Sequence, residues 1–105
     1  MRELVFTFVV DYKGGTYVSQ VPARTVCDAI AAWTRVANWQ AMRIRVSESF
    51  AKRLERELGE DTPVLIEGMT NVWCISPLLA GAVATVTIVA TVKSRCPVAR
   101  LEQPR

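Results

Sequence analysis

The chain has 105 residues, of which 50% are hydrophobic and 22% are charged, and its formal net charge at neutral pH is +3. This length is typical of one domain that buries a sizeable core, and this composition excludes an intrinsically disordered body. The positive charge is spread along the chain, and no single segment forms a strong basic block.

The first predicted element is a strand from Glu3 to Asp11, in which apolar residues recur at every second position. Successive side chains of a strand point to opposite faces of a sheet. The alternation therefore places Phe6 and Phe8 on one face, and Val5 and Val9 on the other. The second face is semi-apolar.

Two glycines follow this strand, and a Gly-Gly pair between two β-rich runs predicts a hairpin with a two-residue loop. With Gly14–Gly15 as the loop, Phe8 lies opposite Val21 of the return strand, which runs from Thr16 to Val21. A loop at Lys13–Gly14 leaves the same residues on each face. The assignment of faces is therefore independent of which loop forms.

The next predicted element is an amphipathic helix from Thr25 to Asn38. Thr25 is the expected N-cap, because its hydroxyl can accept a hydrogen bond from a free amide of the first turn. Trp33 belongs to the apolar stripe of this helix. We expect this stripe to pack on the sheet face that carries Phe6 and Phe8.

A second amphipathic helix is predicted from Ser47 to Leu58, with Gly59 just past its end. The segment between the helices, Trp39 to Val46, is compatible with a short edge strand. In that interpretation Arg43 and Arg45 face the solvent and guard the edge against aggregation.

The stretch from Val72 to Val92 has no charged residue and is long enough for a helix to cross a bilayer. Strands are the better interpretation, because Ala82 to Val92 contains only Ala, Val, Thr and Ile, and its three threonines share one face of an alternating pattern. We predict two antiparallel strands, Asn71 to Ser76 and Ala82 to Lys93, joined by Pro77 to Gly81. Because the second is long, we expect it inside the sheet.

A short strand is also expected at Val64 to Glu67. The fold class is then α+β, with one mostly antiparallel sheet in the order β-β-α-(β)-α-β-β-β and two helices on one face. Residues 1–93 form the predicted single domain, and residues 94–105 a poorly ordered tail. The predicted core consists of Phe6, Phe8, Ile30, Trp33, Leu54, Trp73, Val86 and Ile88.

Motifs for catalysis, cofactors and metals are missing from the sequence. With no histidine there is no Ser-His-Asp or Cys-His arrangement and no imidazole metal site, and neither a glycine-rich phosphate loop nor a CxxC pair occurs. We therefore predict a protein that is not an enzyme and has no cofactor. Its odd number of cysteines indicates free thiols in a reducing cytoplasm. Cys27, expected in the first turn of a helix, is the candidate reactive thiol, with a buried structural role as the alternative.

The order of strand, YKGGTYVSQV hairpin and helix with CDAIAAW over residues 5–33 resembles the opening of HicB-type antitoxins. That family has an extra strand with a Gly-Cys element, which this chain lacks between Val21 and Thr25. Nothing beyond residue 40 corresponds. The resemblance implies an antitoxin-like role for this part of the chain.

The semi-apolar face of the predicted sheet is the candidate functional surface. Val5 and Val9 contribute to it from the first strand, and Val83 and Val89 from the last. Such a face is often buried against a partner or a second copy. We therefore expect a small cytoplasmic protein-interaction module that binds a protein partner or itself, in the manner of an antitoxin or immunity-type inhibitor. The alternatives are a small-ligand-binding or a nucleic-acid-binding protein.

Overall fold

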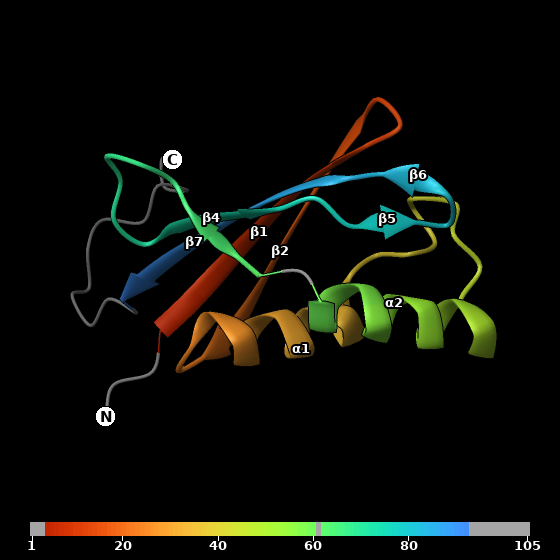
Figure 1. Cartoon of the computed structure of the whole chain (residues 1–105), viewed down its shortest axis with the longest axis horizontal. Helices are drawn as coiled ribbons and strands as arrows, with labels where there is room; N and C mark the ends of the chain where they lie inside the picture. Colours follow the sequence, from red (N-terminus) through yellow and green to blue (C-terminus); the bar gives the residue numbers. More distant parts are fainter. Residues whose placement is uncertain (1–3, 61, 93–105) are drawn as a thin grey trace, which may run out of the picture.

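The structure, a computed structural model, describes residues 4–60 and 62–92. A five-stranded antiparallel sheet with the strand order β2-β1-β7-β4-β3 lies over two helices, which share one of its faces (Figure 1). The predicted α+β fold class is confirmed, whereas the predicted tail at residues 94–105 lies outside the described residues. The elements are β1 (Leu4–Tyr12), β2 (Gly15–Ala23), α1 (Val26–Val36), α2 (Glu48–Glu60), β3 (Val64–Leu65), β4 (Val72–Ile75), β5 (Leu78–Leu79), β6 (Ala82–Val83) and β7 (Thr85–Val92).

The β1–β2 hairpin closes with Tyr12 opposite Gly15, so its loop consists of Lys13 and Gly14. Both loop residues have positive φ angles, 48° and 83°, as the right-handed twist of a two-residue hairpin requires. Of the two loops compatible with the sequence, the second one forms, and Phe8 therefore lies opposite Ser19. The face assignment holds, because Phe8 is buried against the helices.

Strand β7 lies in the centre of the sheet, between β1 and β4, as its length and composition predicted. Val86, Ile88 and Ala90 are buried, whereas its odd-numbered residues are half-buried or exposed, and Val92 at its end is exposed. The uncharged stretch from Val72 to Val92 thus forms strands and not a helix. No helix in the described part of the chain is long and apolar enough to cross a membrane.

The connection before β7 differs from the prediction, which placed Pro77 to Gly81 in a loop and began one long strand at Ala82. Leu78–Leu79 and Ala82–Val83 instead form a separate two-stranded sheet, β5–β6. The amide of Ala84 donates to the carbonyl of Pro77 at 2.9 Å and joins this small sheet to β7. The long strand is divided because β6 has a local partner in β5.

Ala80 occupies the tight turn between β5 and β6 with a φ angle of 51°. This left-handed conformation costs an L-residue about 1–2 kcal/mol, whereas glycine adopts it freely but loses more entropy on folding. We expect Ala80→Gly to raise the free energy of unfolding by about 0.5–1 kcal/mol. Urea denaturation measures this change, and a loss of stability would contradict the turn geometry.

Helix α1 begins at its predicted cap, and helix α2 is capped by Ser47. The hydroxyl of Thr25 accepts a hydrogen bond from the amide of Asp28 at 3.1 Å, and that of Ser47 accepts one from the amide of Phe50 at 3.1 Å. Helix α1 ends at Val36, two residues before the predicted end. Helix α2 continues through Gly59, because this glycine keeps a helical conformation and does not adopt the positive φ of a helix-ending residue.

The short edge strand with which the sequence of Trp39 to Val46 is compatible does not form. The segment forms turns in which Trp39 and Ile44 are buried, and the amide of Ile44 donates to the carbonyl of Trp39 at 2.9 Å. The alternation of charged and apolar residues here arises from a loop that folds its apolar side chains under the core. Arg43 takes a positive φ of 61°, which breaks any strand geometry.

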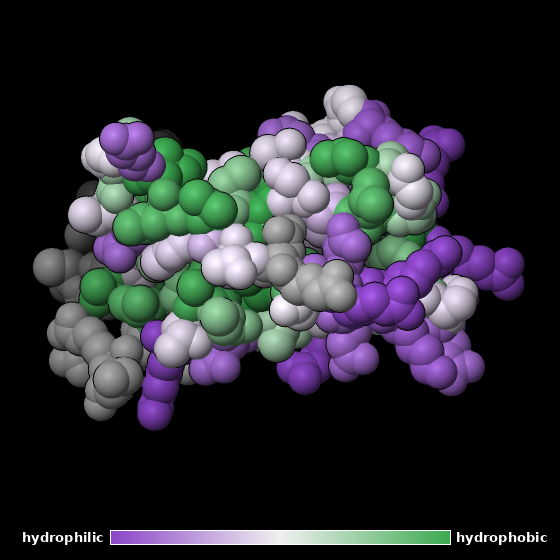
Figure 2. Space-filling model, in the orientation of Figure 1, coloured by the Kyte–Doolittle hydropathy of each residue, from purple (hydrophilic) through white to green (hydrophobic). Residues whose placement is uncertain are grey.

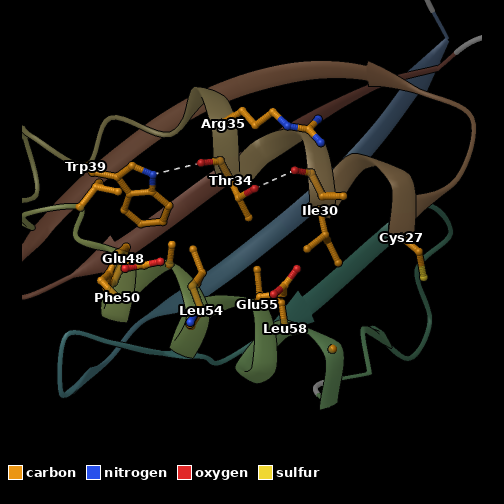
Figure 3. A pocket seen from close by; sticks show the side chains of 15 residues that line it. Cys27, Ile30, Thr34, Arg35, Trp39, Glu48, Phe50, Leu54, Glu55 and Leu58 are labelled. Carbon is orange, nitrogen blue, oxygen red and sulfur yellow. Dashed lines mark hydrogen bonds between the residues drawn. The ribbon is translucent and has the colours of Figure 1, made fainter.

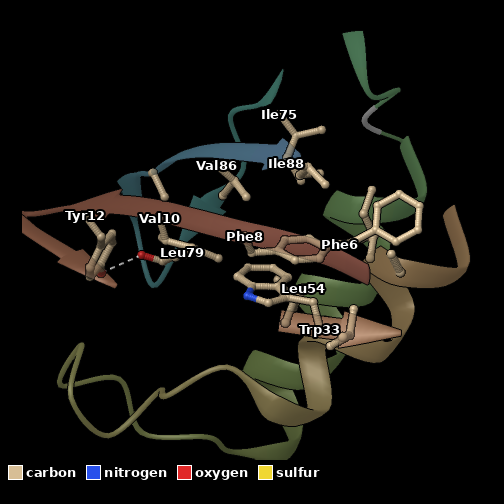
Figure 4. Packing of buried hydrophobic residues seen from close by; sticks show 14 of the residues in the cluster. Phe6, Phe8, Val10, Tyr12, Trp33, Leu54, Ile75, Leu79, Val86 and Ile88 are labelled. Atoms are coloured by element: carbon tan, nitrogen blue, oxygen red, sulfur yellow. Dashed lines mark hydrogen bonds between the residues drawn. The ribbon is translucent and has the colours of Figure 1, made fainter. Parts of the chain in front are cut away.

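The core lies between the sheet and the helices (Figure 4). Seven of the eight predicted core residues are buried in it, whereas Trp73 is only half-buried and packs against it. A chain of aromatic contacts crosses it. Trp33 of α1 stacks on Phe8 of β1 with 5.3 Å between ring centroids, and Trp39 packs edge-on against Trp33 at 5.4 Å. Trp39 then contacts Phe50 of α2 at 5.4 Å. These rings link both helices to the sheet.

Candidate interaction surface

The face of the five-stranded sheet that points away from the helices is called the outer face here. Its residues alternate along each strand with the buried residues, and the strand register joins them into rows. One row runs across the whole sheet. Its members, in the order of the strands, are Val18, Val9, Thr87, Cys74 and Val64.

The neighbouring rows have the same composition of valines, threonines and other uncharged side chains. Asp11 is the one ionised residue among the described residues of the outer face, and it lies at the corner beside the hairpin loop. The remaining members are Val5, Thr7, Thr16, Gln20, Pro22, Val72, Thr85, Val89 and Thr91.

The structure brings together three of the four predicted interface residues. Val5 and Val9 of β1 and Val89 of β7 are half-buried on the outer face, with Val89 directly opposite Thr7. Val83 lies apart from them, because it belongs to β6 and pairs with Leu78 in the small sheet. Val83 is 63% exposed.

Several polar side chains of the outer face bond to one another or to the sheet itself. Gln20 Nε2 donates to Thr7 Oγ1 at 2.8 Å, and Thr16 Oγ1 donates to a carboxylate oxygen of Asp11 at 2.8 Å. Thr91 Oγ1 donates to the carbonyl of Val5 at 3.3 Å. A polar group that keeps its hydrogen bond is much cheaper to remove from water than an unpaired one. Covering this face therefore leaves these groups satisfied.

Sequence reasoning missed several members of the outer face. Val18, which is 64% exposed, could have been found from the alternation of the return strand. Cys74 and Val72 could not, because their place depends on the pairing of β4 with β7. The register between strands far apart in sequence leaves no local signal.

Exposed apolar side chains also gather at the side of the sheet where β3 and the small sheet lie (Figure 2). Leu65 of β3 is 52% exposed, and Leu78 and Val83 form an exposed cross-strand pair of the small sheet. Hydrophilic side chains cover α2 in the same view. Much of the exposed apolar surface in this view therefore lies over β3 and the small sheet.

An open groove of about 530 Å³ separates α1 from α2 (Figure 3). Ile30, Leu54 and Leu58 form its apolar wall, and Arg35 and Glu55 lie at its rim. Its lining also includes Glu48, Phe50, Lys52 and Trp39. The indole Nε1 of Trp39 donates to the carbonyl of Thr34 at 3.1 Å.

The candidate thiol Cys27 lies in the first turn of α1, as predicted, at one end of the groove (Figure 3). Its side chain is exposed and free, which rules out the alternative of a buried structural cysteine. Cys74 is also a free thiol, whereas Cys96 lies outside the described residues. Within residues 4–60 and 62–92, no three Cys, Asp or Glu side chains gather as a metal site would require.

The fold and these surfaces define a small α+β domain with an outer face that is uncharged apart from Asp11 at its corner. No protein-family model matches the chain, and neither the curated proteins nor the solved structures contain a match to it. The resemblance to HicB-type antitoxins therefore rests on residues 5–33 alone.

Proposed function

We propose that the protein is an interaction module that binds another protein chain through the outer face of its sheet and does not turn over a substrate. The observation that carries this proposal is a row of uncharged side chains across five strands, Val18 to Val64, beside which Thr7, Gln20 and Thr91 already have hydrogen-bond partners. An antitoxin or an immunity-type inhibitor is the form of module we favour. The free thiols of Cys27 and Cys74 fit a reducing cytoplasm.

The size of the face supports a partner that covers most of it. Five strands about 4.8 Å apart, with lengths that average about 20 Å, give roughly 500 Å² of flat area. A specific interface buries about 600–1,000 Å² of accessible surface on each partner. The partner must therefore extend over nearly all of the rows, and Val9 and Val89 lie near their centre.

Replacing Val9 and Val89 together with lysine is expected to abolish partner binding and leave the fold intact. Both side chains are half-buried and point away from the helices, so lysine can reach water in the free protein. In a covered face the two ammonium groups would lie unpaired, at a cost of about 3 kcal/mol or more, which weakens binding at least about a hundredfold. Affinity capture and sedimentation velocity of wild type and variant measure the effect.

Val36→Lys is the matched control, because Val36 is exposed on α1, on the other side of the molecule. This variant should bind like the wild type. If wild type and double variant capture the same partners with the same affinity, the outer face is not the binding surface.

The groove between α1 and α2 supports a second candidate function, the binding of a small ligand. Its volume of about 530 Å³ is within the range of small-molecule sites, and its wall is apolar with charged groups at the rim. In this case Lys52→Ala and Leu58→Ala would alter ligand binding, and the variants of the outer face would not. Nucleic acid is disfavoured on the outer face, because this face carries no basic side chain to contact phosphate.

A further inference from the structure

Strand β2 forms a long, unprotected edge of the sheet. It has nine residues and lies at one end of the strand order, whereas the opposite edge is β3, with two residues. No charged side chain occurs between Gly15 and Ala23. Charged side chains, especially lysine, are the usual means by which an edge strand avoids pairing with another chain. This edge has none.

The hairpin register determines which backbone groups of β2 point outward. Tyr12 and Gly15 close a two-residue loop and therefore form a hydrogen-bonded pair. Bonded and non-bonded pairs alternate along an antiparallel ladder, so Val18 lies in a non-bonded pair with Val9. The N–H and C=O groups of such residues point away from β1, toward the free edge.

The pairing of β7 with β4 and β1 leads independently to the same direction for the backbone groups of Val18. The amide of Ala90 donates to the carbonyl of Asn71 at 2.9 Å, so the even-numbered residues of β7 bond toward β4. The odd-numbered residues of β7 then bond to the odd-numbered residues of β1, including Val9. Val9 thus directs its backbone groups to β7, and those of Val18 are left for the free edge.

By the same alternation, Thr16, Gln20 and Pro22 also face the free edge. None of the interstrand and loop backbone bonds within the described residues gives Thr16, Val18 or Gln20 an outward partner. Pro22 has no backbone N–H, so this end of the edge cannot donate a hydrogen bond to a neighbouring strand. The pairing surface is therefore the segment from Gly15 to Val21.

We propose that a second copy of this chain pairs with this edge, antiparallel and centred on Val18, to form a continuous ten-stranded sheet. In this register Val18 faces Val18 of the second copy, and Thr16 faces its Gln20. All three outward residues then form bonded pairs, with about six backbone hydrogen bonds across the junction. If the pairing were centred on Tyr17 or on Ser19 instead, one of the three outward residues would lack a residue of the second copy that can form both backbone hydrogen bonds with it.

The edge is self-complementary, which favours a second copy over an unrelated strand. Such a twofold pairing closes on itself and leaves only the short β3 at the two ends of the sheet, so no filament grows. Val18, exposed by 64%, gains an apolar neighbour. The pairing does not depend on the proposed function, although it would double the area of the outer face.

Helix α1 leaves room for this pairing. It covers the end of β2 where Val21 and Ala23 are buried, whereas Tyr17 and Ser19, nearer the loop, are only half-buried. The tip of the hairpin extends away from both helices (Figure 1). Antiparallel pairing about Val18 places the covered ends of the two copies at opposite ends of the junction.

Val18→Pro tests the junction without breaking the β1–β2 ladder. The amide that proline removes points outward, as at Pro22, so no bond to β1 is lost. We expect a concentration-dependent dimer of the wild type in sedimentation velocity, and a monomer for Val18→Pro over the same concentrations. Val18→Thr keeps the amide and should still dimerise. Circular dichroism confirms that each variant is folded.

Cysteine pairing tests the register, in a background with Cys27, Cys74 and Cys96 replaced by serine. Opposed residues of a bonded pair are about 5.5 Å apart between Cα atoms, within the range of a disulfide. Val18→Cys should therefore form a disulfide-linked dimer under mild oxidation. Thr16→Cys alone should not, whereas Thr16→Cys mixed with Gln20→Cys should.

A wild type that stays monomeric at every concentration overturns this proposal, as does a dimer that persists in Val18→Pro. A dimer abolished by the Val9 and Val89 lysines but not by Val18→Pro would place self-association on the outer face. That outcome supports the proposed function and contradicts the edge pairing. A dimer that Val18→Pro abolishes, in a protein that captures no partner, would support the edge pairing and contradict the proposed function.

Discussion

Replacing Trp33 with alanine is expected to lower the free energy of unfolding by about 3–5 kcal/mol, the usual range for truncating a large buried aromatic side chain. Trp33 is fully buried, stacks on Phe8 and contacts Trp39 edge-on, so its loss opens a cavity where α1 meets the sheet. Urea denaturation followed by circular dichroism measures the change. A loss below about 1 kcal/mol would contradict this packing.

Trp33→Phe is the control that separates ring packing from the indole nitrogen. The buried Nε1 of Trp33 has no hydrogen-bond partner among the described residues, and an unpaired buried donor costs about 1–3 kcal/mol. Phenylalanine keeps a ring against Phe8 and removes this donor. We therefore expect Trp33→Phe to lose clearly less stability than Trp33→Ala.

Leu79→Ala is expected to lower the free energy of unfolding by about 2–5 kcal/mol, and Leu78→Ala by less than about 1 kcal/mol. The two leucines are neighbours in β5, but Leu79 is fully buried and Leu78 is 50% exposed. The carbonyl of Leu79 also accepts a buried hydrogen bond from the Tyr12 hydroxyl at 2.8 Å, which fixes the small sheet against β1. The difference between the two variants is measured in the same urea titration.

Equal losses for the two leucines would mean that the small sheet is not docked through Leu79. The amide of Leu78 donates to Glu57 Oε2 at 3.0 Å, a backbone contact that both alanine variants keep. The comparison therefore isolates the side chains.

The main elements could be predicted because their signals are local. Alternation of apolar residues marks β1 and β7, and helical spacing with a capping hydroxyl marks α1 and α2. The segment from Trp39 to Val46 shows the limit, because a buried loop can alternate apolar and charged residues as a strand does. The small sheet escaped prediction because Leu78 and Leu79 pair through a turn whose first residue, Ala80, is not a typical left-handed residue.

The candidate surface was predictable only in part. Val5, Val9 and Val89 follow from alternation within single strands, and the structure brings them onto one face. Val83 was placed with them on the assumption of one continuous strand, which ends where β6 pairs with β5. Cys74 joined the face through a register between strands that no local pattern encodes.

The rate of alkylation at Cys74 tests most directly whether the outer face binds another chain. Cys74 lies on this face opposite Thr87, whereas Cys27 is exposed on α1 and serves as the internal control. Peptide mass spectrometry follows each thiol separately, in the dilute purified protein and in its complex with captured partners. If binding covers the outer face, Cys74 reacts more slowly in the complex while Cys27 reacts at an unchanged rate. Equal rates at Cys74 in the free protein and in the complex would contradict it.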